Sequence, residues 1–247
     1  MLKIATRKTR FGTISILKNK RTGALLYSQG GFHQSEIDAQ GVSLLYYVHA
    51  LGGLLRQTAP KTVLIIGCAG GTLATALAQT GVQVTAVDVN PHAFQLARAY
   101  FGLHDSVDCR LADGYEFLVG ARRKFDAIVL DAFHGDVIPD HVRERSFFAA
   151  VVARLKPKGV FFANVHIAHD RDFAADKMAA EMASAWRSVR ILDRKGRRHR
   201  NAILMAGNVR TLRKPALSQR PATDLHYVAN ALRDMRFHKI RRAPRSG

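Results

Sequence analysis

The chain has 247 residues, 47% of them hydrophobic, which is enough for one α/β domain with a full core and a small appendage, and which excludes a disordered chain. Its apolar runs are too short to span a membrane, and the charged amino-terminal residues are not followed by an apolar stretch. We therefore expect no membrane contact, no secretory signal and a cytoplasmic location. Cys68 and Cys109 have neither disulfide nor metal-ligand spacing and are expected to be reduced.

The formal net charge of +19 comes mainly from the two ends of the chain. Residues 187–247 contain 17 lysines and arginines against three acidic residues, and the first 21 residues contain seven basic and no acidic residues. Clustered basic side chains attract phosphates, so region 187–247 is a candidate for nucleic-acid contact. The alternative is a solvated basic face, because no stacking aromatic residues or known nucleic-acid motif accompany the charges.

Residues 1–58 are predicted to form a β-hairpin region followed by a helix. Residues 11–35 alternate short β-type runs with polar turns. From residue 37 to residue 57 the apolar side chains recur at helical spacing. Pro60 then separates this helix from the main domain.

Residues 59–210 alternate strands with helices. Five apolar runs rich in β-formers are read as buried strands: TVLIIG, VQVTAVDV, SVDCRLA, FDAIVLDA and GVFFANV. Helices are predicted between and after them, at 72–80, 91–101, 114–119 and 140–155. This order predicts a Rossmann-like α/β fold, with a mostly parallel sheet covered by helices on both faces. Residues 188–206 are predicted to add a closing antiparallel pair.

Residues 211–247 are predicted to form a basic carboxy-terminal extension. Only a short helix near 223–236 is indicated there. The last residues, RFHKIRRAPRSG, are expected to be mobile.

A glycine-rich turn follows the first strand of the main domain, in IIGCAGGTLATAL. Gly67, Gly70 and Gly71 allow a tight turn and close approach of a ligand, and the next helix offers its amino-terminal N–H groups. The alternative is a tight turn without a ligand, because the spacing differs from the usual G-x-G-x-x-G.

Two carboxylates follow the next two strands. Asp88 ends its strand 21 residues after Gly67, where a carboxylate can accept hydrogen bonds from both ribose hydroxyls of a nucleotide. Asp113-Gly114 ends the third strand, where a carboxylate can accept from an adenine amino group. For each aspartate the structural alternative is a helix cap.

Asp131 ends the fourth strand and is followed by His134, Asp136, Asp140 and His141. In open α/β sheets ligands bind beyond the carboxyl ends of the strands, so Asp131 is a candidate general base, or the group that orients an attacking amine. The residues after it do not have metal-ligand spacing, and no metal is expected.

Five segments, in this order and spacing, resemble the spermidine synthase family of aminopropyltransferases within the class I methyltransferase-like fold: ALLYSQGGFHQS, VLIIGCAGGTL, VDVNPHAFQLARAYFGL, ADGYEFL and FDAIVLDAFHGDVIPDH. The resemblance covers residues 12 to 164 approximately. It implies decarboxylated S-adenosylmethionine as the donor, a polyamine amine as the acceptor, and a homodimer.

By position, the resemblance implies a role for each matched residue. Asp88 would hold the ribose, and Asp113 and Gly114 the adenine. Asp131 would be the catalytic aspartate that orients or deprotonates the amine. Gln34 matches a glutamine near the donor site.

Three positions depart from the family. The aspartate of the glycine turn is missing where Gly70 and Gly71 stand, the acidic partner after the catalytic aspartate is His134, and the expected acceptor-site tyrosine is matched by Ser43. Each change removes a group that would hold a cation, and a polyamine needs such groups to replace its water. The altered turn also admits ordinary S-adenosylmethionine, and with it methyl transfer.

Three functions are therefore compatible with the sequence. The first is aminopropyl transfer to an amine, with Asp131 as the base. The second is a methyltransferase that uses S-adenosylmethionine, with an anionic or nucleic-acid acceptor. The third is a non-catalytic nucleotide- or RNA-binding protein, which fold alone does not exclude.

Overall fold

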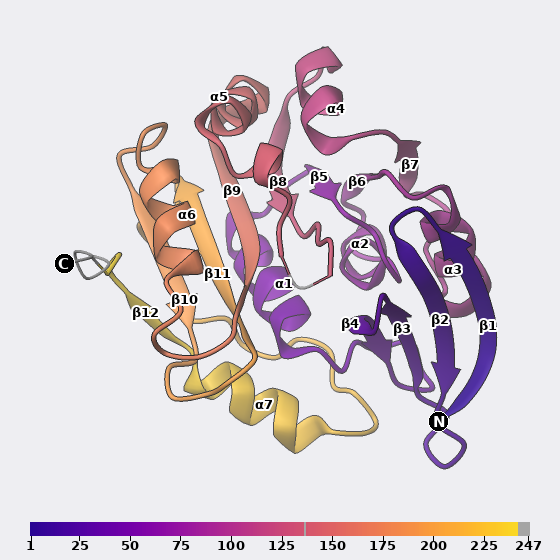
Figure 1. Ribbon diagram of the computed structural model, residues 1–247. Helices are drawn as coiled ribbons and strands as arrows, with labels where there is room; N and C mark the ends of the chain where they lie inside the picture. Colours follow the sequence, from indigo (N-terminus) through magenta and orange to yellow (C-terminus); the bar gives the residue numbers. More distant parts are fainter. Residues whose placement is uncertain (136, 242–247) are drawn as a thin grey trace.

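The computed structural model describes residues 1–135 and 137–241; Asp136 and the last six residues of the tail lie outside the described residues. Figure 1 shows a small amino-terminal sheet beside a larger central sheet. The small sheet is antiparallel in the order β1 (Leu2–Thr9), β2 (Gly12–Lys18), β3 (Leu25–Gln29), β4 (Phe32–Ile37). The predicted hairpin region is thus a four-stranded sheet, which begins before residue 11.

The central sheet has eight described strands in the order β12-β10-β11-β9-β8-β5-β6-β7. Their bounds are β5 Thr62–Ile66, β6 Gln83–Asp88, β7 Asp108–Leu111, β8 Phe125–Leu130, β9 Leu155–Ile167, β10 Val189–Asp193, β11 Arg200–Gly207 and β12 Arg236–His238. Strands β5 to β9 pair in parallel, whereas β11, β10 and β12 pair antiparallel. The predicted Rossmann-like fold and its closing antiparallel pair are confirmed.

Helices cover both faces of this sheet. Their bounds are α1 Tyr46–Thr58, α2 Thr72–Ala78, α3 Pro91–Phe101, α4 Gly114–Gly120, α5 Arg145–Arg154, α6 Ala174–Met182 and α7 Leu225–Asp234. One buried cluster joins the sheet to α1, α2 and α7, and another joins the opposite face to α4, α5 and α6. Helix α3 packs partly against the small sheet.

The buried strands carry apolar side chains on both sides because helices cover both faces of the sheet. In β5, Val63 and Ile65 belong to the cluster with α1, whereas Leu64 and Ile66 belong to the cluster on the other face. Every position of such a strand is therefore buried, as in parallel sheets generally.

The helix predicted at 37–57 is wrong at its beginning, because α1 starts only at Tyr46. The carboxylate of Asp38 accepts hydrogen bonds from the backbone N–H groups of Gln40 and Val42, both at 2.9 Å. This side chain stabilises a turn in place of a first helical turn.

Other expectations also need correction. The run SVDCRLA is not a buried strand: β7 is the edge of the sheet, and Leu111 is 60% exposed. The single helix predicted at 140–155 is two elements, a 3₁₀ turn at Asp140–Val142 and the helix α5. They are separate because the backbone of Glu144, which lies between them, is extended. Helix α6 was not predicted.

The residues after 210 pack against the main domain. Val228, Leu232 and Met235 share the buried cluster of α1, and β12 joins the edge of the central sheet. Part of the basic segment 187–247 is internal: Arg200 is 1% exposed and forms an ion pair with Asp193. The domain boundaries after residues 58 and 210 stay predictions. Within the described part of the chain, no helix is both long and apolar enough to cross a membrane.

Candidate functional site

A cavity of about 1530 Å³ lies between the small sheet and the carboxyl ends of the parallel strands. This is the edge at which ligands bind in open α/β sheets, and the volume exceeds that of a typical pocket for one small ligand. Most of the sequence-predicted site residues line it together: Gln34, Gly67, Gly71, Asp88, Asp113, Gly114 and Asp131. Gly70 does not line it.

The glycines of the turn between β5 and α2 have two different roles: two border the cavity, and one contacts the small sheet. Gly67 and Gly71 have φ angles of +98° and +67°, which favour glycine, and both border the cavity. Gly70 instead donates its N–H to the Ser35 hydroxyl at 3.0 Å, and a β-carbon there would meet the Phe101 ring at 2.9 Å. Gly70 therefore joins the turn to the small sheet and does not face a ligand.

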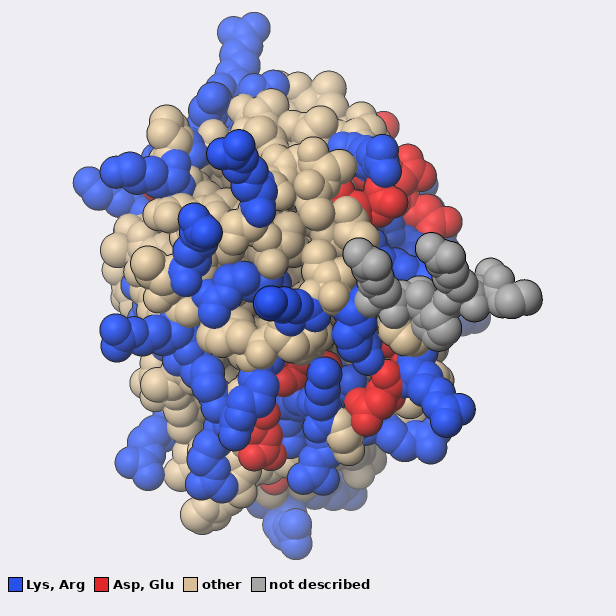
Figure 2. Space-filling model, turned by 90° about the vertical axis from the view of Figure 1, so that its left-hand side faces the viewer, with Lys and Arg blue, Asp and Glu red and all other residues tan. Residues whose placement is uncertain are grey.

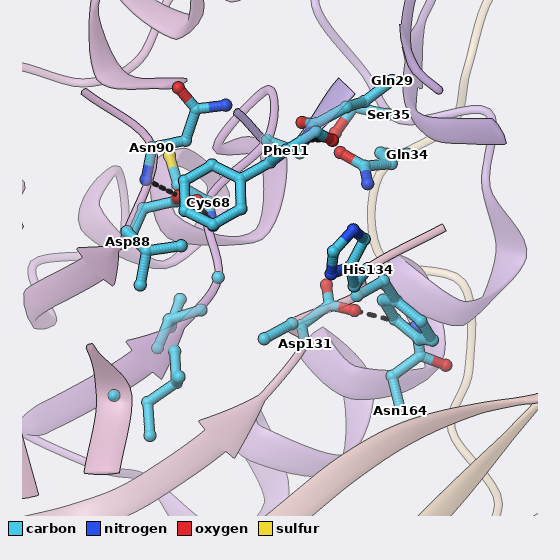
Figure 3. Close-up of a pocket in the computed structure, with 18 of the residues that line it drawn as sticks. Phe11, Gln29, Gln34, Ser35, Cys68, Asp88, Asn90, Asp131, His134 and Asn164 are labelled. Atoms are coloured by element: carbon cyan, nitrogen blue, oxygen red, sulfur yellow. Dashed lines mark hydrogen bonds between the residues drawn. The ribbon is translucent and has the colours of Figure 1, made fainter. Parts of the chain in front are cut away.

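Asp88 lies at the end of β6, close to this turn. Its carboxylate accepts hydrogen bonds from the N–H groups of Cys68 at 2.9 Å and Asn90 at 2.8 Å (Figure 3). Burial raises the pKa of Asp88, and these backbone hydrogen bonds act in the opposite direction. The carboxylate is thus fixed in direction at the cavity wall, where it can accept from hydroxyl groups of a ligand.

Asp113 is the N-cap of α4, which was the structural alternative to a binding role for this residue. One carboxylate oxygen accepts from the N–H groups of Tyr115 and Glu116, and the other lies 2.8 Å from Nε2 of His141. The neighbouring Gly114 is needed for packing, since a β-carbon would lie 2.3 Å from a methyl carbon of Ile66. Both residues still border the cavity.

Asp131 follows β8 on the other side of the cavity from Asp88 (Figure 3). Burial raises its pKa to about 6, although a hydrogen bond from Asn164 Nδ2 at 2.8 Å acts in the opposite direction. A carboxylate with a pKa near 6 is ionised at neutral pH and is a better proton acceptor than an ordinary aspartate. This placement suits a general base.

Asn164 on β9 is a candidate site residue that sequence reasoning missed. Its Oδ1 accepts from Nδ2 of Asn201 at 3.0 Å, so its Nδ2 is directed to Asp131. Asn201 in turn exchanges backbone hydrogen bonds with the hydroxyl of Tyr46. A lone asparagine inside the apolar run GVFFANV was the available signal.

Tyr47 is the second missed residue. It is buried at the cavity wall and donates its hydroxyl to the backbone oxygen of Gln34 at 3.2 Å. Burial and the nearby Asp131 raise the pKa of Tyr47 well above its usual value, so the phenol stays protonated. Ser43, the position matched to a tyrosine, is buried outside the cavity, with its backbone oxygen 2.7 Å from His49 Nε2.

The tip of the hairpin between β1 and β2 reaches over the cavity. Phe11 lies edge-on to the ring of His134, with ring centres 6.4 Å apart, and Arg10 lies over Phe11 at 4.7 Å. All three side chains line the cavity. In residues 1–135 and 137–241, no three His, Cys, Asp or Glu side chains are grouped to hold a metal ion.

The sequence of this chain matches one protein family and several curated proteins. Residues 63–159 match the methyltransferase-domain family. The chain is 32% identical to the polyamine aminopropyltransferase of Vibrio vulnificus over 151 residues, which are 58% of this chain and 48% of that protein. It is 36% identical to the polyamine aminopropyltransferase of Chromobacterium violaceum over 133 residues, 51% of each chain.

Among solved structures, the chain is similar to a probable spermidine synthase from Corynebacterium glutamicum. The TM-score is 0.78 at 20% identity, over 97% of this chain and 92% of the other. The chain spans about half the length of the curated relatives it matches. The predicted resemblance is confirmed: this chain has a spermidine synthase-like class I methyltransferase fold.

Proposed function

We propose that this chain, with its spermidine synthase-like fold, transfers an aminopropyl group from decarboxylated S-adenosylmethionine to an amine. The observation that carries the proposal is the position of Asp131. This carboxylate has a raised pKa and lies in the same cavity as Asp88, across from it. The relatives named polyamine aminopropyltransferases support the same chemistry.

Each half of the cavity has its own task in this proposal. The ends of β5, β6 and β7 provide Gly67, Asp88 and Asp113 for the nucleoside of the donor. The ends of β8 and β9 provide Asp131 and Asn164 for the acceptor amine. We call these the donor half and the acceptor half.

The reaction needs one base and correct positioning. The amine nitrogen forms a bond to the aminopropyl carbon as the carbon–sulfur bond breaks, and the bonding electrons stay on sulfur, which becomes a neutral thioether. Asp131 accepts the proton that the nitrogen loses. Asn164 holds the carboxylate oxygen in place, and Tyr47 closes the wall beside it. Because the sulfonium is a good leaving group, positioning and proton removal account for the catalysis.

The first experiment is a calorimetric titration with S-adenosylmethionine, its decarboxylated form and methylthioadenosine, followed by turnover assays with radiolabelled donor and an amine. We expect the decarboxylated donor to bind more tightly than S-adenosylmethionine, and methylthioadenosine to be released during turnover. If none of the three nucleosides binds, the proposal fails.

Methyl transfer is the second candidate, and the match of residues 63–159 to the methyltransferase-domain family favours it. The glycine turn supports it as well, because no carboxylate stands at Gly70 or Gly71 to select a donor amine. Tighter binding of S-adenosylmethionine, together with release of S-adenosylhomocysteine, would replace the first candidate with this one.

Contact with nucleic acid through region 187–247 stays a prediction. Lys and Arg side chains spread over the face seen in Figure 2, which is the side of β12 and α6 in Figure 1. Binding of single-stranded RNA that weakens steeply with added salt would support it, whereas salt-insensitive binding would contradict the electrostatic origin. The cytoplasmic location, the homodimer and the non-catalytic alternative also stay predictions.

A further inference from the structure

The acceptor half of the cavity contains few negative charges. Four carboxylates line the described cavity, and three of them belong to the donor half: Asp88, Asp113 and Glu116. Asp88 is held by backbone amides, Asp113 caps α4 beside His141, and Glu116 is exposed on that helix. Of the cavity-lining carboxylates in residues 1–135 and 137–241, Asp131 is the one left for the acceptor, and the proposed reaction uses it for the proton of the attacking amine.

Histidine side chains outnumber carboxylates among the described residues that line the cavity. Six of the eleven histidines in the chain line the cavity. On the acceptor side, the rings of His166 and His199 stack at 5.6 Å, with 15° between their planes. His134 follows Asp131 after two residues and lies on the same side of the cavity (Figure 3).

Further polar groups on this side are amides, the Tyr47 hydroxyl and one guanidinium. Asn164 and Asn201 bond to each other beside Asp131, and Arg10 lies over Phe11 at the hairpin tip. The imidazoles and the guanidinium can donate hydrogen bonds, and none of these groups is an anion. A second ammonium group on the acceptor would lose water here, and no described residue that lines this side offers it a second carboxylate, which makes its burial costly.

We propose that the acceptor is an amine whose far end carries an anionic group, such as a carboxylate, and not a polycationic polyamine. The inference rests on the proposed function, and it leaves the bonds formed and broken unchanged. The amine end lies at Asp131, and the anionic end is directed to the His166–His199 stack and Arg10. The net charge of +19 repels a polyamine at long range and does not repel an acceptor whose ammonium and carboxylate charges cancel.

Three amines of equal chain length test this inference: 1-aminobutane, 4-aminobutyrate and 1,4-diaminobutane. Each is titrated into the full chain by calorimetry, with and without saturating methylthioadenosine. We expect 4-aminobutyrate to bind more tightly than 1-aminobutane, and 1,4-diaminobutane to bind more weakly than 1-aminobutane. Tightest binding of the diamine, or no binding of 4-aminobutyrate in either condition, would overturn the inference.

A charge-reversing variant sharpens the test. His199 has a φ of +47°, a left-handed conformation that aspartate tolerates better than most residues, so His199→Asp places a carboxylate in the acceptor half with little backbone strain. We expect about tenfold weaker binding of 4-aminobutyrate and tighter binding of 1,4-diaminobutane. The matched control is His226→Asp, the same change at an exposed position of α7 outside the cavity.

The outcomes separate this inference from the proposed function. If 4-aminobutyrate binds preferentially and the His199→Asp variant reverses the preference, the inference holds even when no aminopropyl group is transferred, and only the proposed function fails. If 1,4-diaminobutane is both bound and converted, the proposed function holds and the inference is wrong. Equal effects of His199→Asp and His226→Asp would also contradict the inference, since long-range charge alone would then explain them.

Discussion

A β-carbon on Gly67 would lie 2.3 Å from the backbone oxygen of Asp131, closer than any real contact of this kind. The N–H of Gly67 donates to Val87 at 2.8 Å, and the N–H of Asp131 donates to Ile66 at 2.8 Å. The ends of β5, β6 and β8 are thus held together at one point. Gly67 borders the donor half, and because it has no β-carbon the backbone of Asp131 can lie against it.

The first prediction concerns this close approach. Gly67→Ala should destabilise the fold by about 3 kcal/mol or more, because the methyl group displaces the Asp131 backbone in addition to straining a positive φ. Gly81→Ala is the matched control, since Gly81 has a φ of +83° with open space around its β-position, and it should cost only about 1–2 kcal/mol. Urea denaturation of both variants measures the difference. Equal losses would mean that the contact with Asp131 is unimportant.

The second prediction concerns Asp131 as the base. Asp131→Asn should lower turnover by about 10²–10⁴-fold while donor affinity changes little, because an amide cannot accept the amine proton. Burial raises the pKa of Asp131 to about 6, so its ionised form costs stability above that pH, and the variant should unfold at an equal or higher temperature at pH 8. Retained turnover would remove Asp131 from the mechanism.

The third prediction is a pH profile. The value of kcat/KM for the amine should fall as the pH drops below about 6, because the Asp131 carboxylate of the free protein becomes protonated. The hydrogen bond from Asn164 lowers this pKa, so Asn164→Ala should move the acidic limb to higher pH. A lower kcat/KM with an unmoved limb would mean that Asn164 acts only as a structural residue.

The fourth prediction concerns the donor half. Asp88→Asn should weaken methylthioadenosine binding by about 2–3 kcal/mol, the scale of one or two charge-assisted hydrogen bonds. Asp105→Asn is the control, because Asp105 is fully exposed in a surface ion pair with Arg98 and lies outside the cavity. Calorimetric titration compares the two variants. Unchanged affinity in Asp88→Asn would place the nucleoside elsewhere in the cavity.

The fifth prediction concerns the buried ion pair of the basic segment. Burial alone would raise the pKa of Asp193, but hydrogen bonds from His238 and Arg200 hold it well below the usual range. The stability that this carboxylate contributes is therefore present above about pH 4 and is lost as the pH falls further. Asp193→Asn should cost about 3 kcal/mol at pH 7, because the buried Arg200 keeps its charge and the half-exposed Asp170, at 3.0 Å, is the ionic partner that remains.

Denaturant unfolding at pH 7 tests the effect, with Glu181→Gln as the control. Glu181 forms a half-exposed surface pair with Arg145, and its loss should cost about 1 kcal/mol or less. A small loss in Asp193→Asn would show that Asp170 is a sufficient partner for the arginine.

Local patterns in the sequence determined the class of fold and most of the donor half. Apolar runs of strand length, separated by helices, require a doubly covered parallel sheet, and that sheet brings its carboxyl ends to one edge. Gly67, Asp88, Asp113 and Asp131 each follow such a strand, so their arrival in one cavity follows from chain order alone.

Tertiary structure alone decided which groups complete the acceptor half. Tyr47 lies on a helix outside the strand–turn–helix pattern. Asn201 lies on the antiparallel strand β11, far along the chain, and His199 directly precedes that strand. Their places depend on how α1 packs and on the register between β9 and β11, which no local spacing encodes. Gly70 shows the reverse case: its sequence context fits a ligand turn, but packing against Ser35 turns it away from the cavity. Strands and helices can be predicted from local sequence patterns. The side chains that meet across a cavity are fixed by contacts between segments that are distant in the sequence.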